Sequence, residues 1–187
     1  MPTIPTVLLN DGVAFPELGL GTYNLRGDDG TAAIVSAIGA GYRLLDSAVN
    51  YENEREVGEA VRRAEGEVGV SRDDLIITTK VPGRAHGYDE TLASAEESLA
   101  ALGLDRIDLY LIHWPNPSVD KYLDTWRAMI ALRKSGRVGS IGVSNFTEPM
   151  LTRLIDETGV TPAVNQVELH PYFPQAQLRA FHTEHAI

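Results

Sequence analysis

The sequence contains no cysteine among its 187 residues. This absence excludes a disulfide framework and any zinc site built on thiolates. An excess of basic residues is also missing, because 16 Lys and Arg stand against 26 Asp and Glu and give a formal net charge of −10. Surfaces that bind nucleic acids are normally basic. We therefore expect no nucleic-acid partner.

Long apolar runs are absent as well, and the longest are far shorter than the ~20 residues that span a bilayer. The N-terminal segment Met1–Pro5 shows no basic stretch followed by an apolar one, as a secretion signal would. We therefore expect no membrane partner and a cytoplasmic location. A hydrophobic fraction of 43% with 22% charged residues is typical of a globular protein. The length predicts a single domain over residues 1–187.

A hairpin is predicted near the start of the chain, where Asn10-Asp11-Gly12 separates two short apolar segments. From Leu18 onward, short apolar segments alternate with amphipathic ones. The predicted strands are Leu18–Thr22, Arg43–Asp46, Ile76–Lys80, Leu109–His113, Ser140–Val143 and Ala163–Val167. Several are almost continuously apolar, which is typical of a parallel sheet buried on both faces.

The segments between these strands carry signals for helix ends. Asn53, with Glu56 three residues later, predicts a capping box for a helix that ends near Gly66. Thr147 as N-cap, with a proline in the first turn, predicts a helix that ends at Gly159. The other predicted helices run from about Thr31 to Gly39 or Gly41, from Leu92 to Gly103, from Tyr122 to Gly136, and from Gln175 onward.

Alternating strands and helices predict right-handed crossovers and a parallel sheet. An open doubly wound sheet and a (β/α)8 barrel both fit this order. A dinucleotide-binding open sheet would place G-x-G-x-x-G after its first strand, but Gly19-Leu20-Gly21 is followed by no third glycine. We therefore favour the barrel. The sequence supplies six of its eight units, so the predicted fold is α/β, an incomplete (β/α)8 TIM barrel with an N-terminal β-hairpin.

Polar residues follow the predicted strands. Asp46, Lys80 and His113 each close one strand, and Tyr51 lies in the loop after Asp46. Further polar residues at strand ends are Ser144, Asn145, Asn165 and Gln166. In a parallel barrel these ends meet at one rim, where active sites form. We therefore expect these side chains to share one mouth.

This set of residues favours carbonyl reduction. A phenol has a pKa near 10, and a neighbouring ammonium lowers such a pKa by stabilising the phenolate. Lys80, paired with Asp46, is expected to be that ammonium beside Tyr51, and His113 is expected to donate a hydrogen bond to a carbonyl oxygen. Reduction of a carbonyl by hydride needs a proton donor and a polarising group at one oxygen. The hydride would come from a nicotinamide, because no flavin or metal motif is evident.

Four segments of the sequence carry a resemblance to a known family. They are Leu45–Ala48 with Tyr51, Leu111–Pro115, Ile141–Phe146 and Asn165–Pro171. In this order they resemble the aldo-keto reductase family, and most closely its bacterial 2,5-diketo-D-gluconate reductase branch. The resemblance extends over almost the whole chain.

The resemblance implies a (β/α)8 barrel closed at its bottom by a hairpin. It implies reduction of small aldehydes and ketones, keto-sugar acids included, with NADPH as cofactor, by a protein that is usually monomeric. The implied catalytic residues are Tyr51 as proton donor, Lys80 as its partner, Asp46 paired to Lys80, and His113 as the residue that orients the carbonyl. The implied cofactor-binding residues are Gly21, Thr22, Asp46, Ser144, Asn145 and Gln166. The implied substrate-binding residues are Tyr23, Val49, Tyr51, His113 and Trp114.

Two departures from the family pattern stand out. Pro82 occupies a position where many members carry an aromatic residue that walls the substrate pocket. The segment Glu184–Ile187 would lead, in the family, into a seventh strand, so the units that stack on the nicotinamide and clamp the adenosine 2′-phosphate are not represented. We expect the isolated 187-residue chain to be marginally stable, to self-associate through apolar strand edges, and to bind the cofactor weakly.

Other interpretations of the same residues remain open. Asp46 and Lys80 also suit a plain buried ion pair, Tyr51 a loop tyrosine, and His113 a structural histidine at a strand end. A nicotinamide-binding module without catalysis, an inactive fragment, or a barrel enzyme that forms a Schiff base on Lys80 are the competing functions.

Three further histidines are interpreted as solvent-exposed residues. His182 and His185 lie one helical turn apart, and exposed helix positions explain them better than metal ligation does. His86, in the loop Gly83–Gly87, is expected to be exposed to solvent. No metal site is predicted.

Overall fold

A computed structural model describes residues 4–187. The strands are β1 Thr6–Leu8, β2 Ala14–Pro16, β3 Leu20–Gly21, β4 Leu44–Asp46, β5 Ile76–Val81, β6 Ile107–Ile112, β7 Val138–Ser144 and β8 Asn165–Gln166. The helices are α1 Gly27–Ala40, α2 Glu54–Val68, α3 Tyr88–Leu102, α4 Tyr122–Lys134, α5 Glu148–Thr158 and α6 Ala176–His185. Three short 3-10 helices are η1 Val49–Tyr51, η2 Arg72–Asp74 and η3 Gly83–Ala85.

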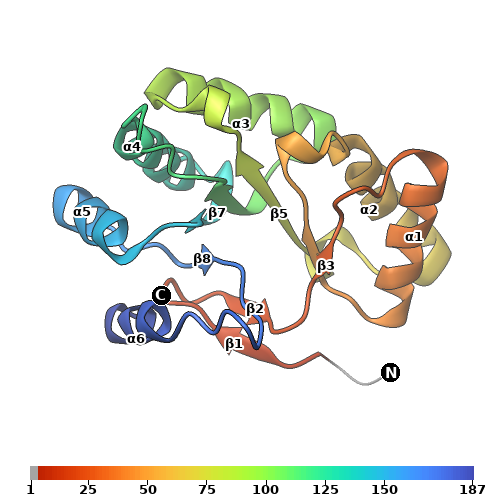
Figure 1. Ribbon diagram of the computed structural model, residues 1–187. Coiled ribbons are helices and arrows are strands. Elements are labelled where there is room, and N and C mark those ends of the chain that lie inside the picture. The colour runs from red at the N-terminus through yellow and green to blue at the C-terminus, as the bar shows by residue number, and fades with distance from the viewer. Residues whose placement is uncertain (1–3) are drawn as a thin grey trace.

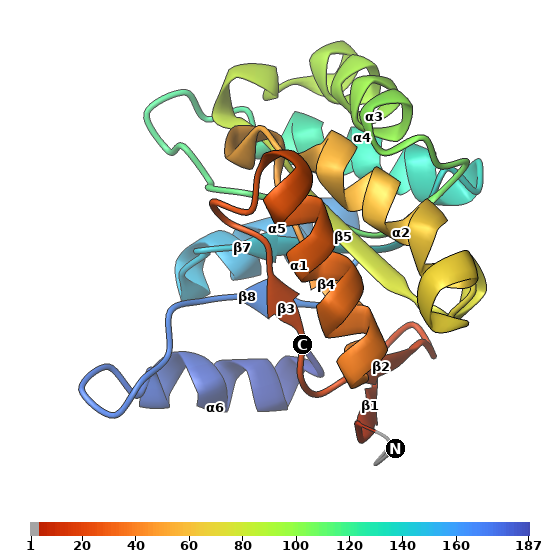
Figure 2. The same ribbon diagram turned by 90° about the vertical axis from the view of Figure 1, so that its right-hand side faces the viewer.

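Six parallel strands form one sheet in chain order, from β3 to β8. Each strand pairs with the next, so that Gly21 stands opposite Asp46 and, at the other edge, Ser144 stands opposite Gln166. Helices α1 to α4 pack against one another in sequence around the outside of the strands (Figure 1). Figure 2 shows the same helices from the side of α1. The prediction of an α/β, six-unit, incomplete barrel is confirmed.

The strands at the centre of the sheet are buried on both faces. All six residues of β6 are buried, which confirms the expectation drawn from their apolar run. Asp108 is the charged member of this strand. Its carboxylate accepts a hydrogen bond from the backbone N–H of Ile77 (2.8 Å) and pairs with Arg72 at 2.6 Å and Arg106 at 3.0 Å. A buried charge is tolerated there because it is fully paired.

The N-terminal hairpin forms as predicted around Asn10-Asp11-Gly12, with β1 and β2 antiparallel. Its tip is fastened to distant parts of the chain. The Asn10 side-chain Nδ2 donates to the carbonyl oxygens of Pro162 and Ala186, each at 2.9 Å. The hairpin therefore lies beside α6, next to the end of the chain (Figure 1). Phe15 of β2 also lines the interior of the barrel.

The predicted capping box of α2 is wrong. The Asn53 side chain makes no cap bond and is fully buried. It donates instead to the carbonyl oxygens of Thr22 (2.6 Å) and Leu25 (3.0 Å), and accepts from Ser47 Oγ (2.9 Å). Glu56 accepts a hydrogen bond from the backbone N–H of Gly27 rather than from Asn53 (2.9 Å). Partners distant in sequence have replaced the local ones.

Other helix ends differ in position. Helix α2 continues through Gly66 and ends at Gly69, whose φ of 69° is the left-handed conformation that glycine adopts at low cost. Helices α1 and α3 begin before the predicted Thr31 and Leu92. Helix α5 matches its prediction, although the Thr147 side chain makes no cap bond. Within residues 4–187, no helix is long and apolar enough to cross a membrane.

Candidate active site

The polar residues predicted at strand ends lie at one edge of the parallel sheet. Asp46 is the last residue of β4, Lys80 is next to the last of β5, and Ser144 and Gln166 end β7 and β8. His113 directly follows β6, and its backbone N–H still donates to Val81 of the neighbouring strand (3.2 Å). Because all these strands run parallel, their carboxyl ends form one rim.

Lys80 is the centre of this rim. Its side chain is 1% exposed, and its Nζ lies 2.5 Å from Asp46 Oδ1. It also donates to the Ser47 carbonyl oxygen (2.9 Å) and to the Tyr51 hydroxyl oxygen (3.2 Å). An ammonium has three N–H donors, so these three oxygens satisfy it completely. The Lys80 ammonium is therefore held in one orientation, against the phenol oxygen.

Asp46 is held from its other side. Its Oδ2 accepts a hydrogen bond from Gln166 Nε2 at 2.8 Å, although the two residues lie 120 positions apart. The carboxylate thus joins β4, β5 and β8 through its two oxygens. A charged pair with one buried partner needs such additional hydrogen bonds to offset the loss of hydration.

Tyr51 stands between two other rings. It ends the short helix η1, and its ring contacts those of Tyr23 and His113 edge to face, at centroid distances of 5.2 and 5.8 Å. Arg26 Nε donates to the Tyr51 carbonyl oxygen (3.2 Å). The phenol is therefore fixed both at its ring and at its backbone, with its oxygen at Lys80.

His113 has a neutral imidazole at pH 7. Burial lowers its pKa from the ordinary value, the positive charge of Lys80 adds to this effect, and Asp46 partly opposes it. Among the described residues, its Nδ1 is buried and has no hydrogen-bond partner. A buried N–H without an acceptor is costly, so the tautomer with the proton on Nε2 is favoured. Nε2 is then a donor.

Ser144, Asn145 and Gln166 form a hydrogen-bonded group. Ser144 Oγ donates to the Gln166 carbonyl oxygen (2.9 Å). Asn145 Nδ2 donates to Ser144 Oγ (3.1 Å) and to the His113 carbonyl oxygen (3.0 Å). Asn145 has a φ of 63°, a left-handed conformation that asparagine tolerates better than most residues. These bonds fix two amide groups beside His113 and Asp46.

The two residues predicted to meet the cofactor after β3 differ in exposure. Thr22 is fully buried, and its hydroxyl donates to the Asp46 carbonyl oxygen (2.9 Å). Gly21 lies on open space, because a Cβ added to it would meet no atom within 4 Å. Of these two residues, Gly21 is therefore the one open to a ligand.

The residues predicted to touch substrate form the outer part of the rim. Tyr23 is 64% exposed and Trp114 is 55% exposed, while Val49 is half-buried. Tyr23 contacts Tyr51, and Trp114 directly follows His113. Large exposed aromatic faces of this kind are typical of a binding surface.

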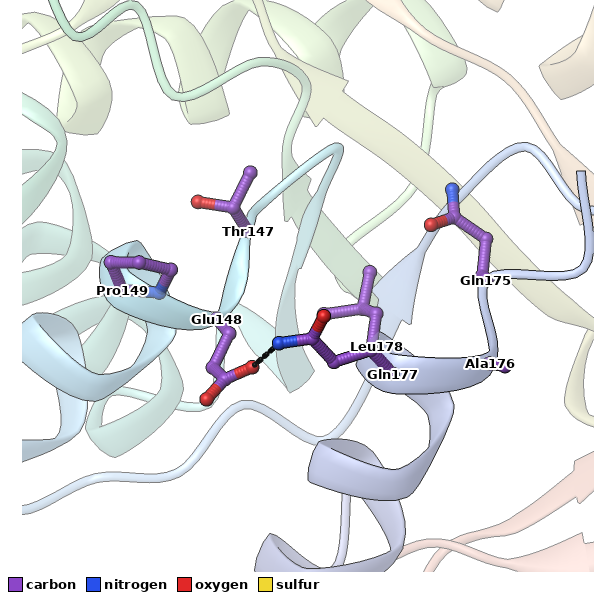
Figure 3. A pocket seen from close by; sticks show the side chains of 7 residues that line it. All are labelled: Thr147, Glu148, Pro149, Gln175, Ala176, Gln177 and Leu178. Atoms are coloured by element: carbon purple, nitrogen blue, oxygen red, sulfur yellow. Dashed lines mark hydrogen bonds between the residues drawn. The ribbon is translucent and has the colours of Figure 1, made fainter.

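A cavity of 530 Å³ opens inside the sheet. Its lining includes Gly21, Asp46, Thr78, Leu109 and Gln166. A separate pocket of 440 Å³ lies between the first turns of α5 and α6, where Gln177 donates to Glu148 (Figure 3). None of the predicted site residues lines this second pocket. Three of them, Gly21, Asp46 and Gln166, line the first cavity.

Two positioning residues escaped the sequence interpretation. Ser47 offers its carbonyl oxygen to Lys80, and Asn53 binds the Ser47 hydroxyl together with two carbonyl oxygens of the segment after β3. Asn53 thus links Ser47, which follows Asp46, to the segment after β3 that packs beside Asp46. Its spacing to Glu56 indicated a helix cap instead, because each of its actual partners comes from another element.

The remaining histidines correct the sequence interpretation. His86 is buried, at 4% exposure, rather than solvent-exposed. His182 and His185 are half-buried rather than exposed. His182 Nε2 lies 2.9 Å from Asn165 Nδ2, whereas His185 bonds the Phe181 carbonyl oxygen and stacks on its ring. In residues 4–187, no group of three potential ligands is arranged to hold a metal ion.

Comparison with known proteins bears on this geometry. The family model described as the Aldo/keto reductase family matches residues 17–187. The chain belongs to this family. It is 70% identical, over its whole length, to 2,5-diketo-D-gluconic acid reductase B of Corynebacterium sp.. It is 47% identical over 98% of its length to methylglyoxal reductase DkgA of Salmonella typhimurium. The chain spans 66% and 65% of the length of these two relatives.

Solved structures of aldo-keto reductases share the fold. A crystal structure of the Brucella melitensis aldo/keto reductase matches 99% of this chain and 71% of its own, with 50% identity and a TM-score of 0.92. The Bombyx mori aldo-keto reductase in complex with NADP matches the whole chain and 65% of its own, with 36% identity and a TM-score of 0.92. The six-strand sheet and the N-terminal hairpin are therefore part of the aldo-keto reductase barrel.

Proposed function

We propose that this protein is an oxidoreductase that transfers a hydride from NADPH to the carbonyl group of small aldehydes and ketones, with Tyr51 as the proton donor. The observation that carries the proposal is the position of Lys80. Its Nζ lies 3.2 Å from the Tyr51 hydroxyl oxygen while Asp46 holds it at 2.5 Å. An ammonium in that place stabilises the negative charge that a phenol acquires as it releases its proton.

The chain's own residues carry the proton chemistry. His113 Nε2–H donates a hydrogen bond to the substrate's carbonyl oxygen and polarises the C=O bond. Tyr51 then transfers its hydroxyl proton to that oxygen as it becomes an alkoxide, and Lys80 stabilises the phenolate that is left. Asp46 holds the lysine in place. NADPH, when bound, supplies the hydride that adds to the carbonyl carbon.

The residues of the rim fit the nicotinamide end of such a cofactor. A carboxamide needs both donors and acceptors, and Ser144, Asn145 and Gln166 offer a hydroxyl and two amides fixed by mutual bonds. Gly21 leaves open space beside Asp46, at the wall of the 530 Å³ cavity. The Bombyx mori relative with NADP supports the choice of cofactor. The names of two relatives favour methylglyoxal and keto-sugar acids as substrates.

Turnover tests this proposal directly. NADPH oxidation is followed at 340 nm with a small aldehyde, and Tyr51→Phe is compared with Tyr172→Phe, which alters a 95% exposed tyrosine. General acid catalysis contributes about 10²–10⁴-fold, so kcat should fall at least 100-fold in Tyr51→Phe and stay unchanged in the control. NADPH binding without turnover by the unmodified chain would refute the proposal and support a non-catalytic binding module.

A Schiff-base reaction at Lys80 has less support. A Schiff base forms through the nitrogen lone pair, but Asp46, the Ser47 carbonyl oxygen and the Tyr51 hydroxyl surround the buried Lys80 nitrogen at 2.5, 2.9 and 3.2 Å. Borohydride in the presence of substrate should therefore leave no covalent adduct on Lys80.

A further inference from the structure

Arg84 is a cation at the rim without an acidic partner. It lies in η3, directly after the strand that carries Lys80, and its side chain is exposed. Its Nη1 donates to Asn50 Oδ1 at 3.2 Å. Asn50 precedes Tyr51 in η1, so the guanidinium contacts the residue next in sequence to the proposed proton donor.

The lack of a partner is notable in so acidic a chain. The net charge is −10, and most surface arginines of the described residues pair with a carboxylate, as Arg137 does with Glu96 and Arg153 with Asp120. Within residues 4–187, no carboxylate lies within 4.0 Å of Arg84. The neighbouring acid Glu52 is paired with Arg26. Arg84 therefore presents a positive charge that no described carboxylate pairs with.

The other nearby acidic residue, Glu54, makes no ion pair with Arg84. Glu54 is 8% exposed, and its carboxyl accepts a hydrogen bond from Thr79 Oγ1 at 2.7 Å. Burial raises the pKa of Glu54, and Arg84 offsets this only in part. Glu54 thus lies within electrostatic reach of Arg84 but makes no ion pair with it.

The backbone around Arg84 is fixed. Pro82 precedes η3, and its carbonyl oxygen accepts the N–H of Ala85 at 2.9 Å, which closes a turn around Arg84. Asn50 uses Oδ1 to hold one guanidinium nitrogen, while the remaining N–H groups of Arg84 and the Asn50 amide are donors. A planar fork of N–H groups matches the two oxygens of a carboxylate.

We propose that Arg84, together with Asn50, binds the carboxylate of an anionic carbonyl substrate and orients its carbonyl carbon toward Tyr51. This inference rests on the proposed function and narrows its substrate class to carbonyl compounds that carry a carboxylate a few carbon atoms from the reacting group. Arg84 sets specificity and takes no part in the proton transfer.

A pair of substrates that differ mainly in charge tests the inference. 4-Carboxybenzaldehyde carries the carboxylate, and methyl 4-formylbenzoate carries its neutral ester. The measured quantity is the ratio of kcat/KM for the acid to kcat/KM for the ester. Because charge-assisted hydrogen bonds are lost, Arg84→Met should lower this ratio about tenfold or more, mainly through KM of the acid, with the ester changed less than twofold.

Matched variants separate a specific contact from a general effect of charge. Arg133→Met removes an exposed arginine from the last turn of α4 and should leave the ratio unchanged. Arg84→Lys keeps the charge without the fork and should give an intermediate ratio. An unchanged ratio in Arg84→Met, with Tyr51-dependent reduction of the ester retained, overturns the inference and leaves the proposed function standing.

A binding measurement covers the case in which neither aldehyde is reduced. That result refutes the proposed function. The role of Arg84 is then tested by the binding of 4-(hydroxymethyl)benzoate, measured by quenching of tryptophan fluorescence. The expected result is binding that weakens about tenfold in Arg84→Met but not in Arg133→Met, and that weakens with added salt. Equal binding by the two variants overturns the inference.

Discussion

Two glycines of α2 predict opposite effects of the same substitution. Gly58 packs against the end of α3, and a Cβ added there would meet the Leu102 carbonyl oxygen and lie 2.6 Å from its carbonyl carbon. Leu102 is fully buried, so this backbone cannot move cheaply. Gly66, two turns further along the same helix, would place its Cβ in open space.

The magnitudes follow from two terms. Gly→Ala within a helix stabilises by about 1 kcal/mol, which is the whole effect at Gly66. Forcing atoms into a packed contact costs about 1–3 kcal/mol or more, and a clash with backbone belongs at the upper end. Gly58→Ala should therefore destabilise by about 2 kcal/mol. At about 2–4 °C per kcal/mol for a chain of this size, Tm falls by about 4–8 °C in Gly58→Ala and rises by about 2–4 °C in Gly66→Ala.

Circular dichroism at 222 nm during heating and urea titration measures both variants against the unmodified chain. Each serves as the other's control, because helix, substitution and assay are the same. A Gly58→Ala variant as stable as the unmodified chain would show that α2 and α3 do not approach as described. Destabilisation by Gly66→Ala would show that α2 does not continue through Gly66.

Two further substitutions probe the buried polar groups. Glu54→Gln should stabilise the protein at pH 8 but not at pH 4, measured by urea unfolding at both values. Burial raises the pKa of Glu54, so its stabilising contribution is present below the unfolded-state pKa and disappears as pH rises through the folded-state value. A constant difference between the variants across pH would contradict this. Asn53→Ala should lower the free energy of unfolding by about 2–4 kcal/mol in the same assay. The substitution leaves the carbonyl oxygens of Thr22 and Leu25 and the Ser47 hydroxyl without a hydrogen-bond partner. A loss below 0.5 kcal/mol would indicate that water replaces the amide.

The sequence predicted those features that depend on local pattern. Apolar runs located all six parallel strands, and the parallel order then placed Asp46, Lys80 and His113 at one rim. Tyr51 follows Asp46 closely in sequence, in the short helix after β4, and there it meets Lys80 and His113. For this reason the group at Lys80 was predictable before its distances were known.

The parts that could not be predicted depend on partners far along the chain. Asn53 and Glu56 have capping-box spacing but do not bond each other. Asn53 donates to carbonyl oxygens of the Thr22–Leu25 segment, and Glu56 accepts from the backbone N–H of Gly27. His86 sits in a loop rich in glycine, which favours exposure, but the fold buries it. Local spacing describes what a residue is able to bind, and tertiary packing decides which partner it meets.

All three N–H groups of the Lys80 side chain have acceptors, and this has a consequence for chemical modification. The sequence contains three lysines, and the other two, Lys121 and Lys134, are exposed. In acylation the amine nitrogen attacks the reagent, and the nitrogen of Lys80 is enclosed by Asp46, a backbone carbonyl and a phenol. Brief acetylation should therefore label the two surface lysines and spare Lys80, so that peptide mass mapping would distinguish a folded rim from a collapsed one.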